Sequence, residues 1–310
     1  MKSAVTAAAA VFGILLLLRA EGPQPVYRVD VNMMVLNFTV KDNKGRYISG
    51  LKPENIRVRE DGIPQSIVSF WEESSKEASI SPGMNRSVFI LFDTSNNMYA
   101  GLVYAQEAIL RFIRQLHPTD HVAVYSFSRN LFRAQGLTPD HQKAIRAVRN
   151  IVAGDQTALF NCLLLTLRDA AKVPGHKAVV VFSNGADDAS MLSPDDVRRV
   201  AEDEGIPIYV VSAGPYNPIS KAVFKRLTEN TGGRVYYAPR WEDQKEAFAA
   251  IREEFQNSYT LTYYPAPNPN EGFRHIEIDI LGKGEERYQV QARPGYRPHT
   301  LGVSARHAAR

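Results

Sequence analysis

Three oxygen-bearing side chains alternate along the stretch that follows an apolar run in the first third of the chain. Residues 88–92 are all apolar, which is typical of a strand buried on both faces. Asp93, Ser95 and Asn97 follow this run directly. Open α/β sheets place their ligand sites at the carboxyl ends of strands. Hard oxygen atoms in that position suit a divalent cation such as Mg²⁺.

The region around these residues alternates between strand and helix patterns. Strands separated by helices of this length predict parallel pairing in an α/β domain with three layers, a mainly parallel sheet between helices. Residues 130–136 are expected to add a short antiparallel edge strand. The predicted strands are 88–92, 121–127, 177–183, 206–212 and 234–237, and the predicted helices are 105–116, 139–152, 159–172, 194–204, 220–230 and 241–256.

The segments on both sides of this α/β region have the patterns of β-strands. Residues 24–72 alternate between apolar and polar, with turn sequences at 42–45 and 61–62, which predicts a small β module. Strand patterns return over residues 257–294. Each segment alone is small for an independent core. We therefore expect the two to pair into one β-sandwich, with the α/β domain of residues 86–256 inserted between them.

The first 20 residues have the outline of a secretory signal peptide. Lys2 gives a positive start, residues 4–18 are uncharged and mostly apolar, and Ala20 could precede a cleavage site. Leu18 is large where a small residue is preferred, so an uncleaved anchor stays open, as does a cytosolic fate. The sequence predicts a secreted or periplasmic protein, or alternatively one anchored to the inner membrane by residues 4–18, which would be its only membrane contact.

The overall composition is that of a globular protein with a small positive charge. The 310 residues are 44% hydrophobic and 23% charged, and they exceed the length of one typical domain. The formal net charge of +4 argues against nucleic acid as the main partner. Cys162 is the single cysteine, so no intrachain disulfide can form. Residues 73–85 are predicted to be a linker, and residues 295–310 a disordered tail.

Two further stretches with oxygen-bearing side chains lie after a predicted strand or before a predicted helix, residues 154–159 (GDQTAL) and 182–187 (FSNGAD). With residues 93–97 (DTSNN), they resemble the metal-ion-dependent adhesion site (MIDAS) of the von Willebrand factor type A (vWA) domain, which is a Rossmann-like fold. The family pattern is D-x-S-x-S, then a threonine in a G-x-T-like loop, then an aspartate in a D-G-x-D segment. The flanking β pieces, including residues 62–65 and 259–265, resemble those of acidobacterial VWFA-related proteins.

This resemblance implies a divalent cation, Mg²⁺ or alternatively Mn²⁺ or Ca²⁺, at the carboxyl edge of the sheet. Asp93, Ser95 and Thr157 would hold it directly or through water. One coordination position would be left for an acidic side chain of a protein partner. The implied function is an exported protein-binding module for adhesion or interaction. The alternative is a metal-independent vWA-fold scaffold protein of the cell envelope.

Two asparagines depart from the family pattern. Asn97 replaces the second serine of the first motif, and Asn184 stands where the family usually has an aspartate. Amide oxygens can bind a cation or a water, but hard cations gain affinity from carboxylates. Asp187 fits the last position of the D-G-x-D segment and could compensate. A functional site, a weak or vestigial site, and structural capping by Asp93 and Thr157 therefore all stay open.

The rim of this site is the expected partner-binding surface. Met98, Tyr99 and Tyr104 follow the first motif immediately. They could start the first helix and pack inward, or they could be exposed anchors for a protein partner.

Enzymatic chemistry has no support in the sequence motifs. A G-x-S-x-G nucleophile elbow, a P-loop and a G-x-G-x-x-G fingerprint are all missing. The seven histidines are scattered and lack the spacing of metal ligands. A hydrolase with an unrecognised site is the remaining enzymatic hypothesis. We therefore predict a protein without enzymatic activity.

Overall fold

The computed structural model describes residues 33–73, 85–214, 217–281 and 288–298. The predicted leader, most of the predicted linker and most of the predicted tail lie outside the described residues. Within the described ranges, no helix is both long and apolar enough to cross a membrane.

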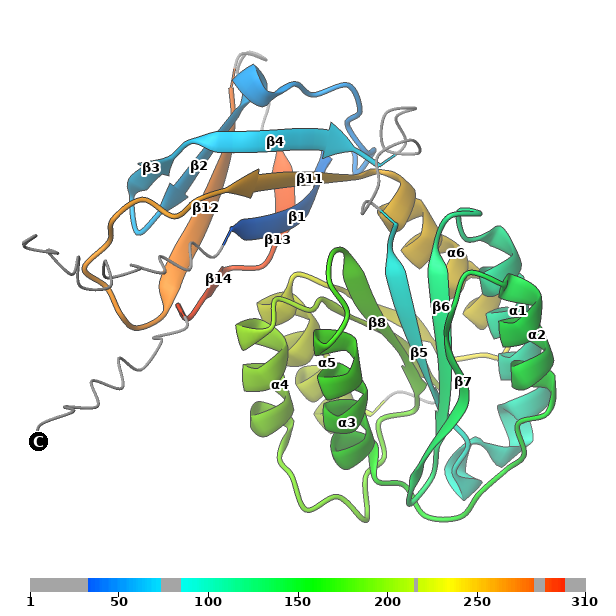
Figure 1. The fold of residues 1–310 in the computed structure, drawn as a ribbon. Coiled ribbons are helices and arrows are strands. Elements are labelled where there is room, and N and C mark those ends of the chain that lie inside the picture. The colour runs from blue at the N-terminus through cyan, green and yellow to red at the C-terminus, as the bar shows by residue number, and fades with distance from the viewer. Residues whose placement is uncertain (1–32, 74–84, 215–216, 282–287, 299–310) are drawn as a thin grey trace, which may run out of the picture. The chain divides into compact units, whose positions relative to one another are not determined.

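A six-stranded sheet is the centre of the α/β domain (Figure 1). Its strands follow the order β10-β9-β8-β5-β6-β7, and all neighbours are parallel except β6 and β7. The predicted mainly parallel sheet and its antiparallel edge strand are confirmed. The strands are β5 (Ser87–Asp93), β6 (His121–Phe127), β7 (Leu131–Thr138), β8 (Lys177–Ser183), β9 (Ile208–Ala213) and β10 (Val235–Ala238).

Helices cover both faces of this sheet, which explains the apolar run in β5. Val88, Ile90 and Phe92 pack into the core under α1, α2 and α6. Phe89 and Leu91 pack into the core under α3, α4 and α5. Because alternate side chains of a strand point to opposite faces, a strand covered on both faces must be apolar throughout. The helices are α1 (Leu102–Gln115), α2 (His141–Arg149), α3 (Leu159–Ala171), α4 (Pro194–Asp203), α5 (Pro218–Thr231) and α6 (Asp243–Gln256).

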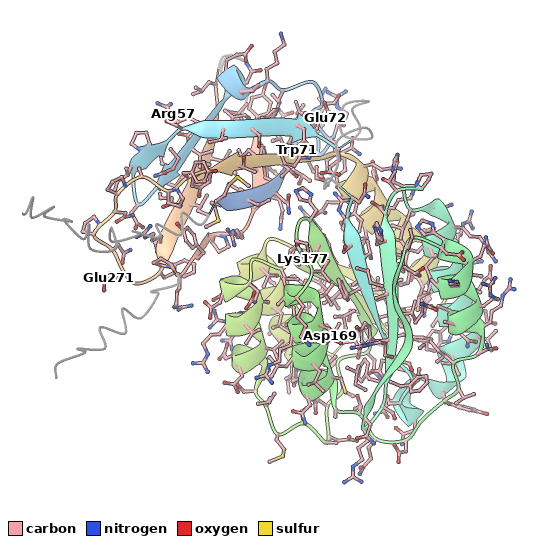
Figure 2. The ribbon with its side chains drawn as sticks, in the orientation of Figure 1. Arg57, Trp71, Glu72, Asp169, Lys177 and Glu271 are labelled. Carbon is pink, nitrogen blue, oxygen red and sulfur yellow. The ribbon has the colours of Figure 1, made fainter. Side chains whose placement is uncertain are left out.

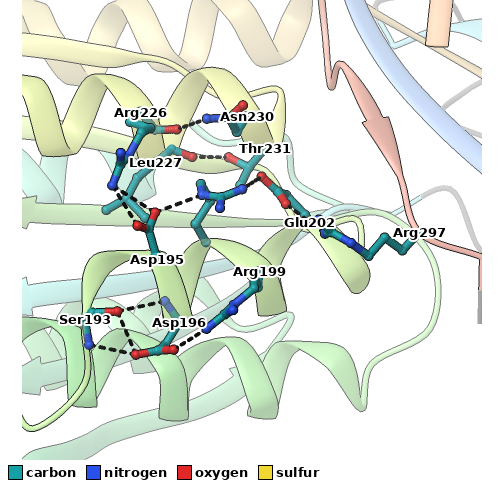
Figure 3. Close-up of polar contacts among 11 residues, drawn as sticks. Ser193, Asp195, Asp196, Arg199, Glu202, Arg226, Leu227, Asn230, Thr231 and Arg297 are labelled. Atoms are coloured by element: carbon teal, nitrogen blue, oxygen red, sulfur yellow. Dashed lines mark hydrogen bonds and ion pairs between the residues drawn. The ribbon is translucent and has the colours of Figure 1, made fainter. Parts of the chain in front are cut away.

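The predicted helix starts have a physical basis in their caps. The Ser193 side chain accepts a hydrogen bond from the backbone N–H of Asp196 at the start of α4, and the Asp196 side chain completes the capping box. The Asn217 side chain caps α5 in the same position. An Arg226–Asp195 ion pair with two 2.9 Å contacts links the two helices (Figure 3).

The flanking segments form two four-stranded sheets around a shared core. Their strand orders are β13-β1-β11-β4 and β14-β12-β2-β3, so each sheet contains strands from both ends of the chain. The expected pairing of the two segments is confirmed. A short η1 helix (Pro53–Asn55) precedes β2. The strands are β1 (Met34–Lys41), β2 (Ile56–Glu60), β3 (Ile63–Gln65), β4 (Ile67–Glu72), β11 (Ser258–Tyr263), β12 (Arg274–Ile280), β13 (Gln289–Ala292) and β14 (Gly295–Tyr296).

Strand β14 corrects the predicted start of the disordered tail. Tyr296 pairs with Arg274 of β12, and its side chain is buried. Its hydroxyl donates a 2.8 Å hydrogen bond to the carboxylate of Glu60. A strand of two residues has no periodicity, so the sequence pattern could not reveal it.

Glu60 also gives the sandwich core a testable polar contact. Its carboxylate is fully buried, and Oε1 accepts a second hydrogen bond, of 2.7 Å, from the Tyr263 hydroxyl. Tyr263→Phe is expected to lower the free energy of unfolding by about 2 kcal/mol, because it removes a hydrogen bond to a buried charge. The matched control is Tyr264→Phe, whose side chain is 49% exposed. Equal guanidinium midpoints for the two variants would contradict the assigned contact.

Candidate metal centre

The end of β5 places a buried carboxylate at the centre of the site. Asp93 is fully buried. Its Oδ1 accepts a 2.9 Å hydrogen bond from the Ser95 backbone N–H, and its Oδ2 accepts one of 2.6 Å from the Ser183 hydroxyl. Strands β5 and β8 are neighbours in the sheet, so their last residues meet. Ser183 was not among the predicted site residues, although the stretch that contains it was recognised.

The side chain of Ser95 is available to bind a cation. Its side chain is fully buried, and no described residue makes a hydrogen bond of ordinary geometry with its Oγ, although the hydroxyl lies close enough to the Asp93 carboxyl to lower the pKa of that group. A buried polar atom without a partner costs about 1–3 kcal/mol, so it calls for an explanation at each position. A cation next to Ser95 would supply the missing interaction.

Thr157 joins the second and third predicted stretches. It is fully buried, and its backbone N–H donates a 2.9 Å hydrogen bond to Oδ1 of Asp188. Its hydroxyl donates a long, 3.3 Å hydrogen bond to the Ala186 carbonyl. The first and second stretches meet where the Asn96 N–H donates a 2.8 Å bond to the Asp155 carbonyl. The structure therefore brings together the three stretches that the sequence analysis combined.

The two asparagines lie at the rim. Asn97 is exposed, whereas Asn184 is partly buried. Oδ1 of Asn184 accepts a 2.9 Å hydrogen bond from the Ala186 N–H, and its Nδ2 donates a 3.5 Å bond to the Asn97 carbonyl. The amide oxygen that could replace the missing carboxylate is thus used within its own loop.

Asp187 has a structural role in this arrangement. Its Oδ2 accepts a 3.1 Å hydrogen bond from the Phe160 N–H at the start of α3, and its Oδ1 accepts one of 2.9 Å from the Ser190 N–H. A carboxylate at a helix start also interacts favourably with the helix dipole. These contacts hold the loop against α3, and they give no support to Asp187 as the compensating cation ligand.

The electrostatics of the site are dominated by Asp93. Burial raises the pKa of its carboxyl, interactions with the Ser183 hydroxyl and with the backbone and side chain of Ser95 oppose this rise, and the nearby charge of Asp187 adds to it. Among the described residues, no three His, Cys, Asp or Glu side chains gather in a metal-binding group. A cation here would therefore depend on one carboxylate together with the hydroxyls of Ser95 and Thr157. This donor set fits a hard cation of modest affinity.

The predicted partner-binding residues separate into one buried and two exposed side chains. Met98, in η2 (Asn96–Gly101), is 1% exposed and belongs to the core, so its prediction as a direct anchor is wrong. The η2 turn directs this side chain inward. Tyr99 and Tyr104 are 72% and 55% exposed. The Tyr104 ring stacks on Trp241 with centroids 6.4 Å apart, so Trp241 adds to an aromatic surface that the sequence analysis missed.

The fold and the site together define a class of protein. A mainly parallel sheet covered on both faces, with buried oxygen atoms at the carboxyl ends of β5 and β8, is a Rossmann-like α/β domain. Residues 88–186 match the family model described as von Willebrand factor type A domain. These residues therefore form a vWA domain.

The chain is also similar to curated proteins and to a solved structure. A UPF0353 protein of Mycolicibacterium paratuberculosis is 25% identical over 217 residues, covering 60% of this chain and 64% of the relative. One of Mycolicibacterium vanbaalenii is 26% identical over 204 residues, covering 55% and 61%. The matches thus span less than two thirds of these relatives' own length. A von Willebrand factor type A structure from Catenulispora acidiphila has a TM-score of 0.50 at 13% identity, covering 70% of this chain and 67% of that one. It shares the fold.

Proposed function

We propose that this chain is an exported, non-enzymatic module that binds a protein partner through a divalent cation at the MIDAS-like centre. The observation that carries the proposal is the buried Ser95 hydroxyl, which has no hydrogen bond of ordinary geometry to any described residue and lies next to the buried carboxylate of Asp93. Burial of the Asp93 carboxylate and of the Ser95 hydroxyl lowers the stability of the fold when no cation is bound, and a cation would stabilise both groups.

Each residue of the site would have a separate role in binding the cation. Asp93 supplies the one negative charge, and the Ser95 and Thr157 hydroxyls supply neutral oxygen atoms. Ser183 holds the carboxylate in place through its 2.6 Å hydrogen bond. When bound, Mg²⁺, Mn²⁺ or Ca²⁺ would supply a positive charge that attracts an acidic side chain of the partner. The site has a single carboxylate, so a partner carboxylate would add a strong ligand that the chain lacks.

The partner surface that we propose includes the exposed aromatic side chains beside the site. Tyr99 and Tyr104 lie on the segment that continues from the first motif, and Trp241 supports Tyr104. Exposed tyrosine and tryptophan side chains contribute disproportionately to protein interfaces.

Titration with Mn²⁺ tests the metal centre. We expect one ion per chain, with at least about tenfold weaker binding to Asp93→Asn, which removes the negative charge, and to Ser95→Ala, which removes an oxygen ligand. Ser95→Ala should change the stability of the metal-free protein little, because the lost hydroxyl makes no hydrogen bond of ordinary geometry to a described residue. Ser87→Ala is the matched control, a buried serine at the opposite end of β5. Equal calorimetric heats from wild type and Asp93→Asn would refute the metal centre.

The alternative is an envelope scaffold that uses the vWA fold without metal. Its support is that Asp187 and Asn184 use their oxygen atoms within the loop, which leaves one carboxylate for a cation. A pull-down from the native envelope with and without chelator separates the two functions. Recovery of the same partner in both samples favours the scaffold.

The location of the protein rests on the predicted leader of residues 1–20. We propose a secreted or periplasmic protein, with an inner-membrane anchor as the alternative outcome. Mass measurement of the mature amino terminus tests this, because an intact Met1 contradicts cleavage.

A further inference from the structure

A pocket of about 150 Å³ opens beside the candidate metal centre. It lies where β9 and β10 end and α5 begins, on the carboxyl edge of the sheet that also carries Asp93. Asn184 lines this pocket and also donates to the Asn97 carbonyl of the first motif. We call it the side pocket. A ligand bound at the metal centre would therefore reach it without leaving the surface.

The side pocket has an apolar wall on one side and polar or charged side chains elsewhere. The Tyr237 ring and Pro239 form an apolar wall, and Ser212 lines the same pocket. The ammonium group of Lys221 lies 5.2 Å from the centroid of the Tyr237 ring. Asn217 also lines the pocket, but its side-chain oxygen caps α5 by accepting hydrogen bonds from two backbone N–H groups. The Ser220 hydroxyl lines the pocket as well and donates a 3.2 Å hydrogen bond to the Gly185 carbonyl. The pocket thus combines an aromatic wall and a cation with polar groups that mostly bond within the chain.

Size and chemistry both favour an aromatic occupant. A cavity of about 150 Å³ is large enough to hold a benzene ring. An aromatic ring of a ligand would gain from contact with the Tyr237 ring. Tyr237 is 42% exposed, so its ring is accessible to a ligand.

We propose that the side pocket binds an aromatic side chain of the partner, adjacent in its sequence to the acidic residue that contacts the cation. This inference rests on the proposed function, because the acidic residue defines which segment of the partner lies there. The positive charge of Lys221 beside the pocket suits the same acidic segment.

Short peptides test the inference on the intact protein with saturating Mg²⁺. The probes are an acetylated, amidated Gly-Gly-Asp-Gly-Gly peptide and its counterparts with phenylalanine, or a second aspartate, directly before or after the aspartate. Binding is followed through amide chemical shifts in ¹⁵N NMR spectra. The variants are Tyr237→Ala, which removes the aromatic wall, and Ser212→Leu, which fills the pocket. Tyr264→Ala is the matched control, an exposed tyrosine outside the pocket.

We expect at least one phenylalanine peptide to bind wild type about tenfold more tightly than the glycine peptide. This preference should disappear in Tyr237→Ala and Ser212→Leu and remain in Tyr264→Ala. A preference that persists in both pocket variants, or a stronger preference for the second aspartate, would overturn the inference.

The experiment also separates this inference from the proposed function. If the glycine peptide binds with Mg²⁺ but phenylalanine adds nothing, the pocket inference fails and the metal centre stands. If the phenylalanine preference occurs equally without Mg²⁺ and in Asp93→Asn, the pocket stands and the metal-dependent function fails.

Discussion

Glu73→Gln is expected to lower the free energy of unfolding by about 3 kcal/mol at pH 7 and by only about 1 kcal/mol at pH 3. Glu73 lies 3.3 Å from Arg86 and 3.3 Å from Nδ1 of His176. Trp71, at the end of β4 (Figure 2), and Thr260 donate further hydrogen bonds of 3.3 and 3.2 Å to its Oε1. Burial raises the pKa of this carboxyl, but the charge of Arg86 and the contact with His176 outweigh burial and lower it to about 2.

The sign of the pH dependence follows from this depressed pKa. The ordinary pKa of the group, about 4.5, applies to the unfolded chain, so the charged form stabilises the fold fully above pH 4.5. This stabilisation is lost as the pH falls from about 4.5 to about 2. Glutamine resembles the protonated carboxyl, so the variant should differ least from wild type in acid.

Chemical denaturation at several pH values measures the effect. Glu229→Gln is the matched control, because Glu229 is an exposed glutamate in a 3.8 Å pair with Lys225. Surface pairs of this kind contribute about 0–1 kcal/mol. A cost of Glu73→Gln that stays constant from pH 7 to pH 3 would contradict the assigned ion pairs.

The fold was predictable because its signals are local. β5 is apolar throughout, and the helix starts at Ser193 and Asn217 carry caps that act within their own turn. The pairing of the two β segments required one further argument, that neither could bury a core alone. Strand β14 was missed because Tyr296 is held by Glu60, a contact between residues 236 positions apart. No local pattern reports such a contact.

The candidate site was predictable only in part. Asp93, Ser95 and Thr157 were grouped through the resemblance of their three stretches to the vWA family pattern, each stretch following a predicted strand or preceding a predicted helix. The burial of Met98 depends on the direction in which the η2 turn points its side chain. The alternation of apolar and polar residues does not predict that direction. The use of Asp187 by the start of α3 and the side pocket around Tyr237 both arise from segments distant in sequence. Residue type alone could not distinguish a ligand from a cap.

Gly233→Ala is expected to lower the free energy of unfolding by about 3 kcal/mol, because the chain has no room for a side chain there. A Cβ at this position would lie 2.0 Å from the backbone oxygen of Ile208, so the backbone of β9 or of the residue itself would have to move. Gly232 ends α5 in the left-handed conformation, with φ of 83°, and Gly233 then donates a 2.9 Å hydrogen bond back to the Thr228 carbonyl. These contacts fix the path of the chain into β10.

A second glycine, Gly136, tests whether the loss of stability in Gly233→Ala comes from the close approach of the added Cβ to the Ile208 backbone. Gly136 lies in edge strand β7, and the nearest atom to its added Cβ would be Cδ of Arg133 at 3.9 Å, an ordinary contact. Gly136→Ala is therefore expected to change stability by no more than about 0.5 kcal/mol. Because β10 carries Tyr237, displacement of the chain at Gly233 should also weaken the phenylalanine preference of the side pocket, whereas Gly136→Ala should leave it intact. Equal denaturation midpoints for the two variants would show that the backbone at Gly233 accommodates a side chain, and would remove the link between this turn and the pocket.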